Sequence, residues 1–377
     1  MMKKRFIYLD NASVTKVDSR VLRAMNIYHT KYYSVPTVEY GHSFGLKSRK
    51  ALEQAREAIA ESINANKDEI IFTSGQTESN NLAIKGFVAM NNTARVITTK
   101  IEHESILNVC KDYGNVAYLD VDREGFIKFN SLKRLQEEGA ILSIQHANHE
   151  IGTVQNIKRI GRFCRKAGIT FHVDATQTFM KLDIDVERMN IDLLTISPHL
   201  IHGPRGIGAL YIRKGVKIKA ILSGGYNEFG IRPGLENIPA IVGFRKAVEI
   251  FDKKDVSRMF KLRDRLMKNL LEIDNTKLNG PLGKDRLCNN VNISFRYVEG
   301  ESMLLHLDLR GIIVTTGSSC FSTALKPSHV ILGIGGRHED AHSSVRFSLS
   351  KYNDVEDIDY TIKNVNEVVS ELRKISM

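Results

Sequence analysis

Apolar positions along the first two thirds of this chain follow two different periods. Leu52, Ala55, Ile59 and Ile63 recur at the spacing of one helix face, and a second helical pattern covers 157–166. Between such stretches lie short continuous apolar runs, which are typical of parallel strands buried on both faces. These runs cover 69–73, 95–98, 140–145, 170–173, 193–196 and 208–212. The alternation predicts an α/β fold in which helices flank a mainly parallel sheet.

The pattern changes near residues 251–255, where apolar positions give way to charge. Strand-like runs follow at 290–295, 312–314 and 345–349, and an amphipathic helical stretch covers 354–372. A chain of 377 residues is also too long for one small core. We therefore expect a large domain over 13–252 and a smaller α+β domain formed by 1–12 and 253–377.

Composition is that of an ordinary globular protein, with 42% apolar and 26% charged residues. No apolar run reaches the ~18 residues of a membrane span. The basic start meets Asp10 before a signal-peptide hydrophobic region develops, so we expect a cytoplasmic protein without a membrane partner. The net charge of +11 could attract nucleic acid or an acidic protein. Because no nucleic-acid motif accompanies it, a solvated surface is the better interpretation.

The four cysteines have no paired spacing, which argues against a disulfide framework or a zinc knuckle. Cys110, Cys164 and Cys288 fall in segments that read as helix or strand, so we expect them to be buried and inert. Cys320 follows Gly317 in a stretch rich in serine and free of nearby acids. Such surroundings favour an exposed, reactive thiol.

Several polar motif residues closely follow predicted strands. Thr77, Asn148, Asp174 and His199 are in this position. Because ligands of such sheets collect at the carboxyl ends of strands, these side chains are expected to converge on one pocket. On its own, Asp174 could equally be a helix cap, and a lone histidine such as His103 is usually a satisfied polar group.

Taken together, the motifs resemble those of the cysteine desulfurases, pyridoxal-phosphate enzymes of fold type I in the class V aminotransferase group. The resemblance runs from Tyr8 to about Leu372, through segments 75–81, 146–152, 172–177, 197–206, 224–237 and 317–320. It implies a homodimer, because the 224–237 segment reaches a neighbouring subunit's site in the family. It also implies L-cysteine as a ligand and a sulfur acceptor or iron–sulfur scaffold protein as a partner.

The resemblance also assigns roles to individual positions. Asp174 would keep the cofactor's pyridine nitrogen protonated, Gln177 would donate to the ring hydroxyl, and His103 would stack on the ring and take part in catalysis. The cofactor phosphate would be held at the start of a helix and by two loop side chains. These phosphate positions are Gly75, Gln76, Thr77, Ser197 and His199. The substrate positions are Asn11, His149 and Arg346.

Leu200 is the decisive departure from the family pattern, because the lysine expected there is both the covalent anchor of the cofactor and a general base. Losing general acid–base help alone costs ~10²–10⁴ in rate. Arg205 is effectively always protonated and is a poor replacement base, and nothing in the sequence shows that His202 can reach the cofactor. Pyridoxal phosphate, if bound, would therefore be held non-covalently.

Further departures affect the surroundings of the site. His149 replaces an asparagine that helps to hold the substrate carboxylate, and Leu235 replaces a threonine that reaches the neighbour's phosphate. The segment 34–42 is longer and less polar than its family counterpart. Arg346 resembles the arginine that grips the substrate carboxylate through two hydrogen bonds.

Three hypotheses follow. The first is a desulfurase homologue in sulfur transfer or iron–sulfur assembly whose ordinary turnover is weak or absent, with Cys320 as sulfur acceptor or as ligand of an iron–sulfur cluster. The second is an active desulfurase that holds pyridoxal phosphate non-covalently. The third is a structural or RNA-associated protein that has an enzyme fold without the enzyme's activity. Only the basic net charge supports this hypothesis.

Overall fold

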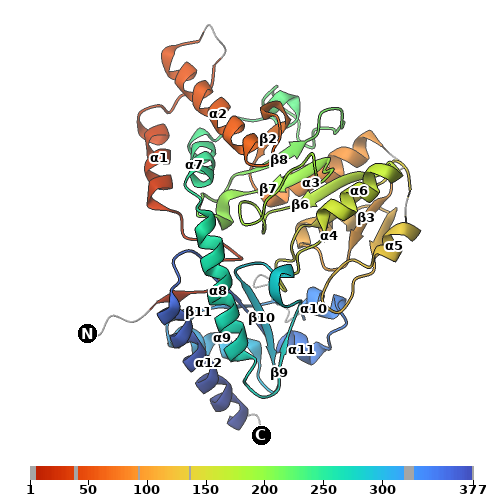
Figure 1. Ribbon diagram of the computed structural model, residues 1–377. Helices are drawn as coiled ribbons and strands as arrows, with labels where there is room; N and C mark the ends of the chain where they lie inside the picture. The colour runs from red at the N-terminus through yellow and green to blue at the C-terminus, as the bar shows by residue number, and fades with distance from the viewer. Residues whose placement is uncertain (1–5, 38–40, 92–93, 136, 318–326, 376–377) are drawn as a thin grey trace.

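The computed structural model describes residues 6–37, 41–91, 94–135, 137–317 and 327–375 (Figure 1). Cys320 and most of its loop lie outside the described residues. The helices are α1 Ser19–Thr30, α2 Ser43–Glu61, α3 Gln76–Met90, α4 Glu104–Lys111, α5 Phe129–Arg134, α6 Ile157–Ala167, α7 Ile238–Glu249, α8 Lys253–Leu270, α9 Gly300–Leu309, α10 His329–Gly333, α11 His338–His342 and α12 Val355–Ile375. The short 3-10 helices are η1 Lys67–Glu69, η2 Pro198–Leu200, η3 Glu228–Gly230 and η4 Gly283–Asp285.

The largest sheet has seven strands in the order β2-β8-β7-β6-β5-β3-β4. Its strands are β2 Ile70–Thr73, β3 Val96–Thr99, β4 Val116–Leu119, β5 Ile141–Gln145, β6 Thr170–Asp174, β7 Leu193–Ile196 and β8 Gly208–Ile212. All neighbours pair in parallel except β8, which is antiparallel to both β2 and β7. The predicted mainly parallel sheet is therefore confirmed. The predicted strand start at Glu69 is wrong, because Glu69 belongs to η1 and its carboxylate accepts the backbone N–H of Asn66.

Helices cover both faces of this sheet, as a doubly covered parallel sheet requires. Side chains alternate between the faces along a strand, so that Ile71 packs with Leu82 of α3 whereas Phe72 packs with Leu52 of α2 and Phe244 of α7. Figure 1 shows α1, α2 and α7 grouped at one end of the molecule, away from α4 and α5. β2, β6 and β7 run in the same direction, because β8 is antiparallel to both β2 and β7 and β6 is parallel to β7. The carboxyl ends of these three strands therefore lie at the same edge of the sheet.

A second core lies beyond α8 and is built on an antiparallel sheet in the order β12-β13-β10-β9, with a parallel β1-β11 pair beside it. The strands are β1 Ile7–Tyr8, β9 Thr276–Leu278, β10 Asn290–Phe295, β11 Ile312–Ile313, β12 Thr315–Thr316 and β13 Ser344–Ser348. Leu266 of α8, Met303 of α9 and Val368 of α12 pack over it (Figure 1). The predicted single strand over 312–314 is wrong, since the chain turns at Val314 and contributes to two different sheets.

The two cores divide the chain close to the charged break near residue 252, with Ile7 and Leu9 joining the second core. Domain limits at residues 12/13 and 252/253 stay a prediction. A small apolar cluster of Ile101, Ile151, Val330 and Ile331 links α10 to the loops of the large sheet. This cluster fixes His329, the first residue of α10, beside the edge where the strands end.

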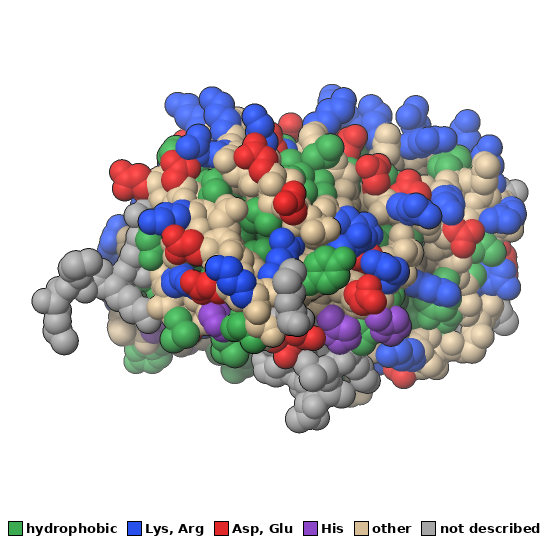
Figure 2. Space-filling view, turned by 90° about the horizontal axis from the view of Figure 1, so that it is seen from below, with side chains coloured by type: hydrophobic (Ala, Val, Ile, Leu, Met, Phe, Trp, Pro, Cys, Tyr) green, Lys and Arg blue, Asp and Glu red, His purple; other side chains and the backbone are tan. Residues whose placement is uncertain are grey.

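Surface and burial bear on several expectations from composition. No helix among the described residues is long and apolar enough to cross a membrane. On the face in Figure 2, Lys and Arg side chains are interspersed with Asp and Glu. Cys110, Cys164 and Cys288 are buried free thiols, as predicted. Cys288, however, lies in a turn before β10 and not in a helix or strand.

Candidate active site

Asp174 lies at the carboxyl end of β6, near the middle of the large sheet, and is buried. Its Oδ1 accepts the backbone N–H of Thr176 at 3.0 Å. Its Oδ2 accepts two side-chain amides, from Gln76 at 2.7 Å and from Asn80 at 2.8 Å. Both amides come from α3, so the start of this helix and the end of β6 are tied together at the carboxylate.

A chain of hydrogen bonds extends from Asp174 to His103. The Asn80 amide also donates to Ser105 Oγ at 2.8 Å, and Ser105 Oγ lies 2.8 Å from His103 Nδ1. The Ser105 backbone N–H donates to the same Nδ1 at 3.1 Å, so this nitrogen is an acceptor and a neutral ring carries its proton on Nε2. Burial lowers the pKa of His103, which favours that neutral ring. Asn80 and Ser105 were not singled out from sequence, because neither residue type at its position suggests chemistry.

Three of the predicted phosphate positions, Gly75, Gln76 and Thr77, lie at the start of α3. Gly75 precedes the helix with φ 148°, and no side chain among the described residues caps it, so its first N–H groups are available to an anion. A Cβ on Gly208 would lie 2.7 Å from Gly75 Cα, so the close approach of β8 requires glycine there. Ser197 Oγ lies 2.8 Å from His199 Nδ1, and burial lowers the pKa of His199 to about 4.

Two polar atoms just beyond Asp174 are buried without a hydrogen-bond partner among the described residues. They are Thr176 Oγ1 and Gln177 Oε1. The Gln177 amide nitrogen donates to the Ala12 carbonyl at 3.0 Å, so the free atom of this side chain is its oxygen. Buried polar atoms without partners are uncommon in native proteins, and here they lie beside a carboxylate and a free helix start. The donor and acceptor set fits a ring that carries polar groups and a phosphate.

Leu200 ends η2 and is 2% exposed. It offers only methyl groups at the position where the family pattern has an amine. His202 does not replace this amine in the observed arrangement. Its Nδ1 lies 2.8 Å from the Lys16 carbonyl, and its ring packs edge-on against Tyr352 with the ring centroids 4.9 Å apart. Burial also lowers the pKa of His202 to about 4.

Lys181 is a buried amine that sequence reasoning missed. It lies in the turn after β6, donates from Nζ to the Gln177 carbonyl at 3.1 Å, and lines a small cavity together with Leu200. Burial lowers its pKa to about 8, and its charge in turn lowers the pKa of His199. Nothing in the sequence marks it, since lysine in a turn normally faces water.

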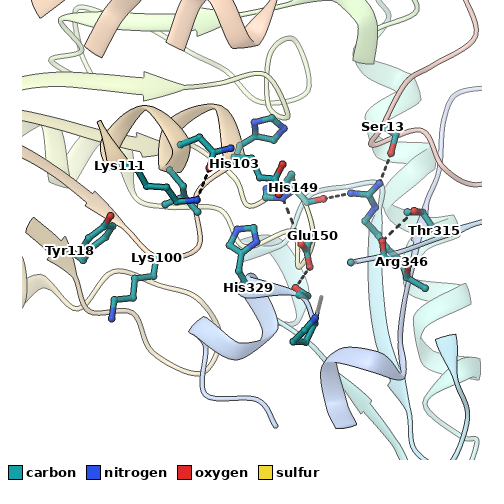
Figure 3. A pocket seen from close by; sticks show the side chains of 17 residues that line it. Ser13, Lys100, His103, Lys111, Tyr118, His149, Glu150, Thr315, His329 and Arg346 are labelled. Carbon is teal, nitrogen blue, oxygen red and sulfur yellow. Dashed lines mark hydrogen bonds and ion pairs between the residues drawn. The ribbon is translucent and has the colours of Figure 1, made fainter. Parts of the chain in front are cut away.

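A pocket of about 780 Å³ opens next to these residues, between the edge of the large sheet and the second core. Figure 3 shows His103, His149 and His329 grouped in it, with Arg346 on one side and Lys100 and Tyr118 on the other. The ring centroids of His103 and His149 are 5.3 Å apart, and those of His149 and His329 are 6.3 Å apart. His329 had no signal in the sequence, because it comes from a segment far along the chain. Within the described ranges, no three His, Cys, Asp or Glu side chains are placed to hold a metal ion.

Arg346 lies in β13 at the wall of this pocket and is largely committed to protein partners. Its Nη1 donates to the His149 carbonyl at 2.9 Å, and its Nη2 donates to Asp10 at 2.8 Å and to Ser13 at 2.7 Å. Three of its five N–H groups are thereby used, while Nε is buried without a described partner. A two-point grip on a substrate carboxylate would have to displace Asp10 or Ser13.

His149 itself is a half-buried ring. Its Nδ1 lies 3.2 Å from Gln145 Oε1, and its Nε2 lies 3.8 Å from a carboxylate oxygen of Glu150. Burial, together with the neighbouring His103, His329 and Arg346, places its pKa well below the usual value. At neutral pH it therefore adds a hydrogen-bonding imidazole to the pocket and not a positive charge.

Of the predicted site residues that the structure describes, His103, His149 and Arg346 line this pocket, and the others lie outside its lining. The Asn11 amide donates to the carbonyls of Tyr8 at 3.0 Å and Ser348 at 2.9 Å, so it joins the N-terminal segment to β13 and faces a different cavity. Leu235 is 71% exposed on the 224–237 segment. Thr77 is exposed at the start of α3.

Comparison with known proteins agrees with this geometry. The family model described as aminotransferase class-V matches residues 7–361. The chain is 44% identical to cysteine desulfurase IscS of Dictyoglomus turgidum, over 99% of this chain and 97% of that protein. It is 43% identical to cysteine desulfurase IscS 1 of Archaeoglobus fulgidus, over 98% of both chains. A solved structure named NifS-like protein superposes with a TM-score of 0.90 at 34% identity, over 97% of this chain and 100% of that chain.

The chain belongs to the cysteine desulfurase family. Membership implies pyridoxal phosphate as cofactor, and the fold-type I architecture is confirmed. In this desulfurase homologue the free start of α3, Ser197 and His199 are suited to the phosphate, and Asp174, Gln177 and His103 are suited to the ring. When bound there, the cofactor supplies an electron sink for carbanion chemistry. The individual residue roles remain predictions.

Proposed function

We propose that this desulfurase homologue acts in sulfur transfer for iron–sulfur cluster assembly, with ordinary desulfurase turnover that is weak or absent. Cys320 would be the sulfur acceptor or a ligand of an iron–sulfur cluster, and pyridoxal phosphate would be held without a covalent bond. The relatives named cysteine desulfurase support the sulfur chemistry and a scaffold or acceptor partner.

The observation that carries the proposal is Leu200. Its side chain is buried next to His199, on the η2 turn that leads away from β7, and it replaces the group that anchors the cofactor and moves a proton in the family. The commitment of Arg346 to Asp10 and Ser13 also supports low turnover, because a substrate carboxylate competes with these partners.

Sulfur transfer to Cys320 needs none of the missing groups. The Cys320 thiolate attacks the outer sulfur of a partner's persulfide, a new S–S bond forms, and the partner's own S–S bond breaks so that it leaves as a thiolate. No oxidant or reductant is consumed. Cys110, Cys164 and Cys288 are poor competitors because burial raises the pKa of each thiol, in the first two cases to about 12.

The test separates release of sulfur from acceptance of sulfur. The chain alone, supplied with pyridoxal phosphate and L-cysteine, should release no sulfide above the cofactor-only blank. With an active family desulfurase and ³⁵S-labelled L-cysteine, label should appear on this chain and be removed by a thiol reductant. Cys320→Ser should abolish the labelling, while the matched control Cys110→Ala should keep it.

Two outcomes would contradict the proposal. Rapid cysteine-dependent sulfide release by the chain alone would favour the active enzyme with non-covalent cofactor. Equal labelling of Cys320→Ser and the unmodified chain would show that Cys320 is not the acceptor.

We also infer a homodimer in which the 224–237 segment contacts the partner. Several large apolar side chains stand exposed on this segment and on the neighbouring α1–α2 region. They are Leu22, Ile27, Tyr33, Phe44, Tyr226, Phe229 and Leu235. A second copy would cover apolar area that is costly to leave in water.

A further inference from the structure

Gln76 donates to one of the two carboxylate oxygens of Asp174, in the candidate cofactor site. It is the first residue of α3, and its side chain folds over the free helix start so that Nε2 lies 2.7 Å from Asp174 Oδ2. Asn80, one turn later on the same helix, donates to this oxygen at 2.8 Å. Two N–H donors therefore already fill Oδ2.

The Asp174 carboxylate has little remaining capacity to accept further hydrogen bonds. A carboxylate offers about four lone-pair sites, two on each oxygen. Oδ2 has both filled, and Oδ1 accepts the backbone N–H of Thr176 at 3.0 Å, which leaves one site, on Oδ1, without a donor among the described residues. The Asn80 and Thr176 donors are built into the network to Ser105 and into the turn after β6, so they cannot leave without wider rearrangement. Gln76 is the one donor of the three that is only half-buried and that ends a flexible side chain.

We propose that Gln76 competes with the cofactor ring for Oδ2 of Asp174, the carboxylate oxygen whose two acceptor sites are already filled. This deepens the proposed function and rests on it, since it concerns the cofactor site of the same desulfurase homologue. A protonated ring nitrogen that donates to Oδ2 would have to displace the Gln76 amide. A hydrogen bond to a charged group is among the stronger ones in proteins, so the displacement lowers cofactor affinity.

The consequence for the site differs from that of Leu200. Leu200 lacks the amine of the covalent anchor, whereas Gln76 would weaken the contact between the ring and Asp174. The helix start, Ser197 and His199 remain available, so binding of the phosphate end is retained while the ring end is contested. Gln76 thereby acts as a specificity-determining residue that disfavours a protonated pyridine.

The experiment is a cofactor-binding titration, not an activity assay. Dissociation constants for pyridoxal phosphate are measured by equilibrium dialysis. The proteins compared are the unmodified chain, in the oligomeric state in which it purifies, and the variants Gln76→Ala and Gln76→Met. Gln76→Met keeps the length of the side chain and removes only the amide. Both variants should bind the cofactor ~10-fold more tightly or better. Asn81→Ala is the matched control, because Asn81 is on the same helix but donates to the Thr77 carbonyl at 2.9 Å.

A double-mutant cycle assigns the effect to Asp174. Asp174→Asn should cancel the gain in the Gln76→Ala background and change affinity much less in the unmodified background. Equal affinities for the unmodified chain, Gln76→Ala and Gln76→Met would overturn the proposal, as would no binding by any of them. A gain in Gln76→Ala alone would also overturn it, because bulk and not the amide would then be the obstacle. Sulfur acceptance by Cys320 is measured without added cofactor, so its failure is separate from failure here.

Discussion

Leu200 and Lys181 line the same cavity of about 20 Å³, so a buried amine lies close to the residue that replaces the cofactor lysine. Lys181 Nζ is turned to the Gln177 carbonyl at 3.1 Å and therefore donates to its own turn. We expect that it forms no bond with the cofactor. After borohydride treatment in the presence of pyridoxal phosphate, mass spectrometry of the peptides should show no pyridoxyl group on any lysine. A pyridoxyl group on Lys181 would contradict the non-covalent site.

Leu200→Lys should restore a covalent, borohydride-reducible bond to the cofactor more readily than it restores sulfide release. His149, Leu235 and the Gln76 contact to Asp174 remain unlike an ordinary site, so cysteine turnover should stay well below that of an active relative. Absorbance of the purified variant with saturating cofactor measures the bond. Leu200→Met is the control, because it fills the same space without an amine, and it should give no reducible bond.

Lys181 should make stability depend on pH in a defined window. Burial lowers its native pKa from 10.5 to about 8, so between these values the unfolded state binds more protons and stability rises with pH. The shift corresponds to about 3 kcal/mol at most. Lys181→Met should lose this rise and should be more stable than the unmodified chain below pH 8. Urea unfolding at pH 7, 8, 9 and 10 measures the difference, and parallel curves for both proteins would contradict it.

Thiol labelling of the native protein should modify Cys320 first. Cys110, Cys164 and Cys288 are buried, and burial raises the pKa of all three thiols, so little reactive thiolate is present at neutral pH. Brief alkylation at pH 7.5 followed by peptide mapping checks the order. Full labelling in denaturant gives the reference, and preferential labelling of another cysteine in the native state would disprove the assignment.

A charge on the 224–237 segment should weaken the proposed dimer. Leu235 is 71% exposed in the single chain, so Leu235→Asp should cost little folding stability but should disfavour an apolar contact with a second copy. Light scattering across micromolar concentrations should show a shift toward monomer. Leu282→Asp is the matched control, since Leu282 is 64% exposed on a loop of the second core, and it should leave the mass unchanged. A monomer for the unmodified chain would remove the dimer altogether.

The sequence alone determined the fold class and most strands of the large sheet. Continuous apolar runs such as those of β7 and β8 can be recognised without knowing which strands lie beside them. A strand that is buried on both faces requires apolar residues at every position. Local pattern also placed Asp174 at a strand end, and the resemblance to the cysteine desulfurases marked Leu200 as lacking the expected amine. It failed at 312–314, where pairing with two different sheets splits one apolar run.

Only the tertiary structure decided what these residues contact. Gln76 and Asp174, or His149 and His329, are distant along the chain and meet because parallel strands bring their ends to one edge and α10 packs against it. The burial that gives Lys181 its lowered pKa and the committed hydrogen bonds of Arg346 likewise depend on partners from other segments. Sequence pattern records which residues must be buried, whereas hydrogen-bond partners and protonation depend on distances that only the packed chain sets.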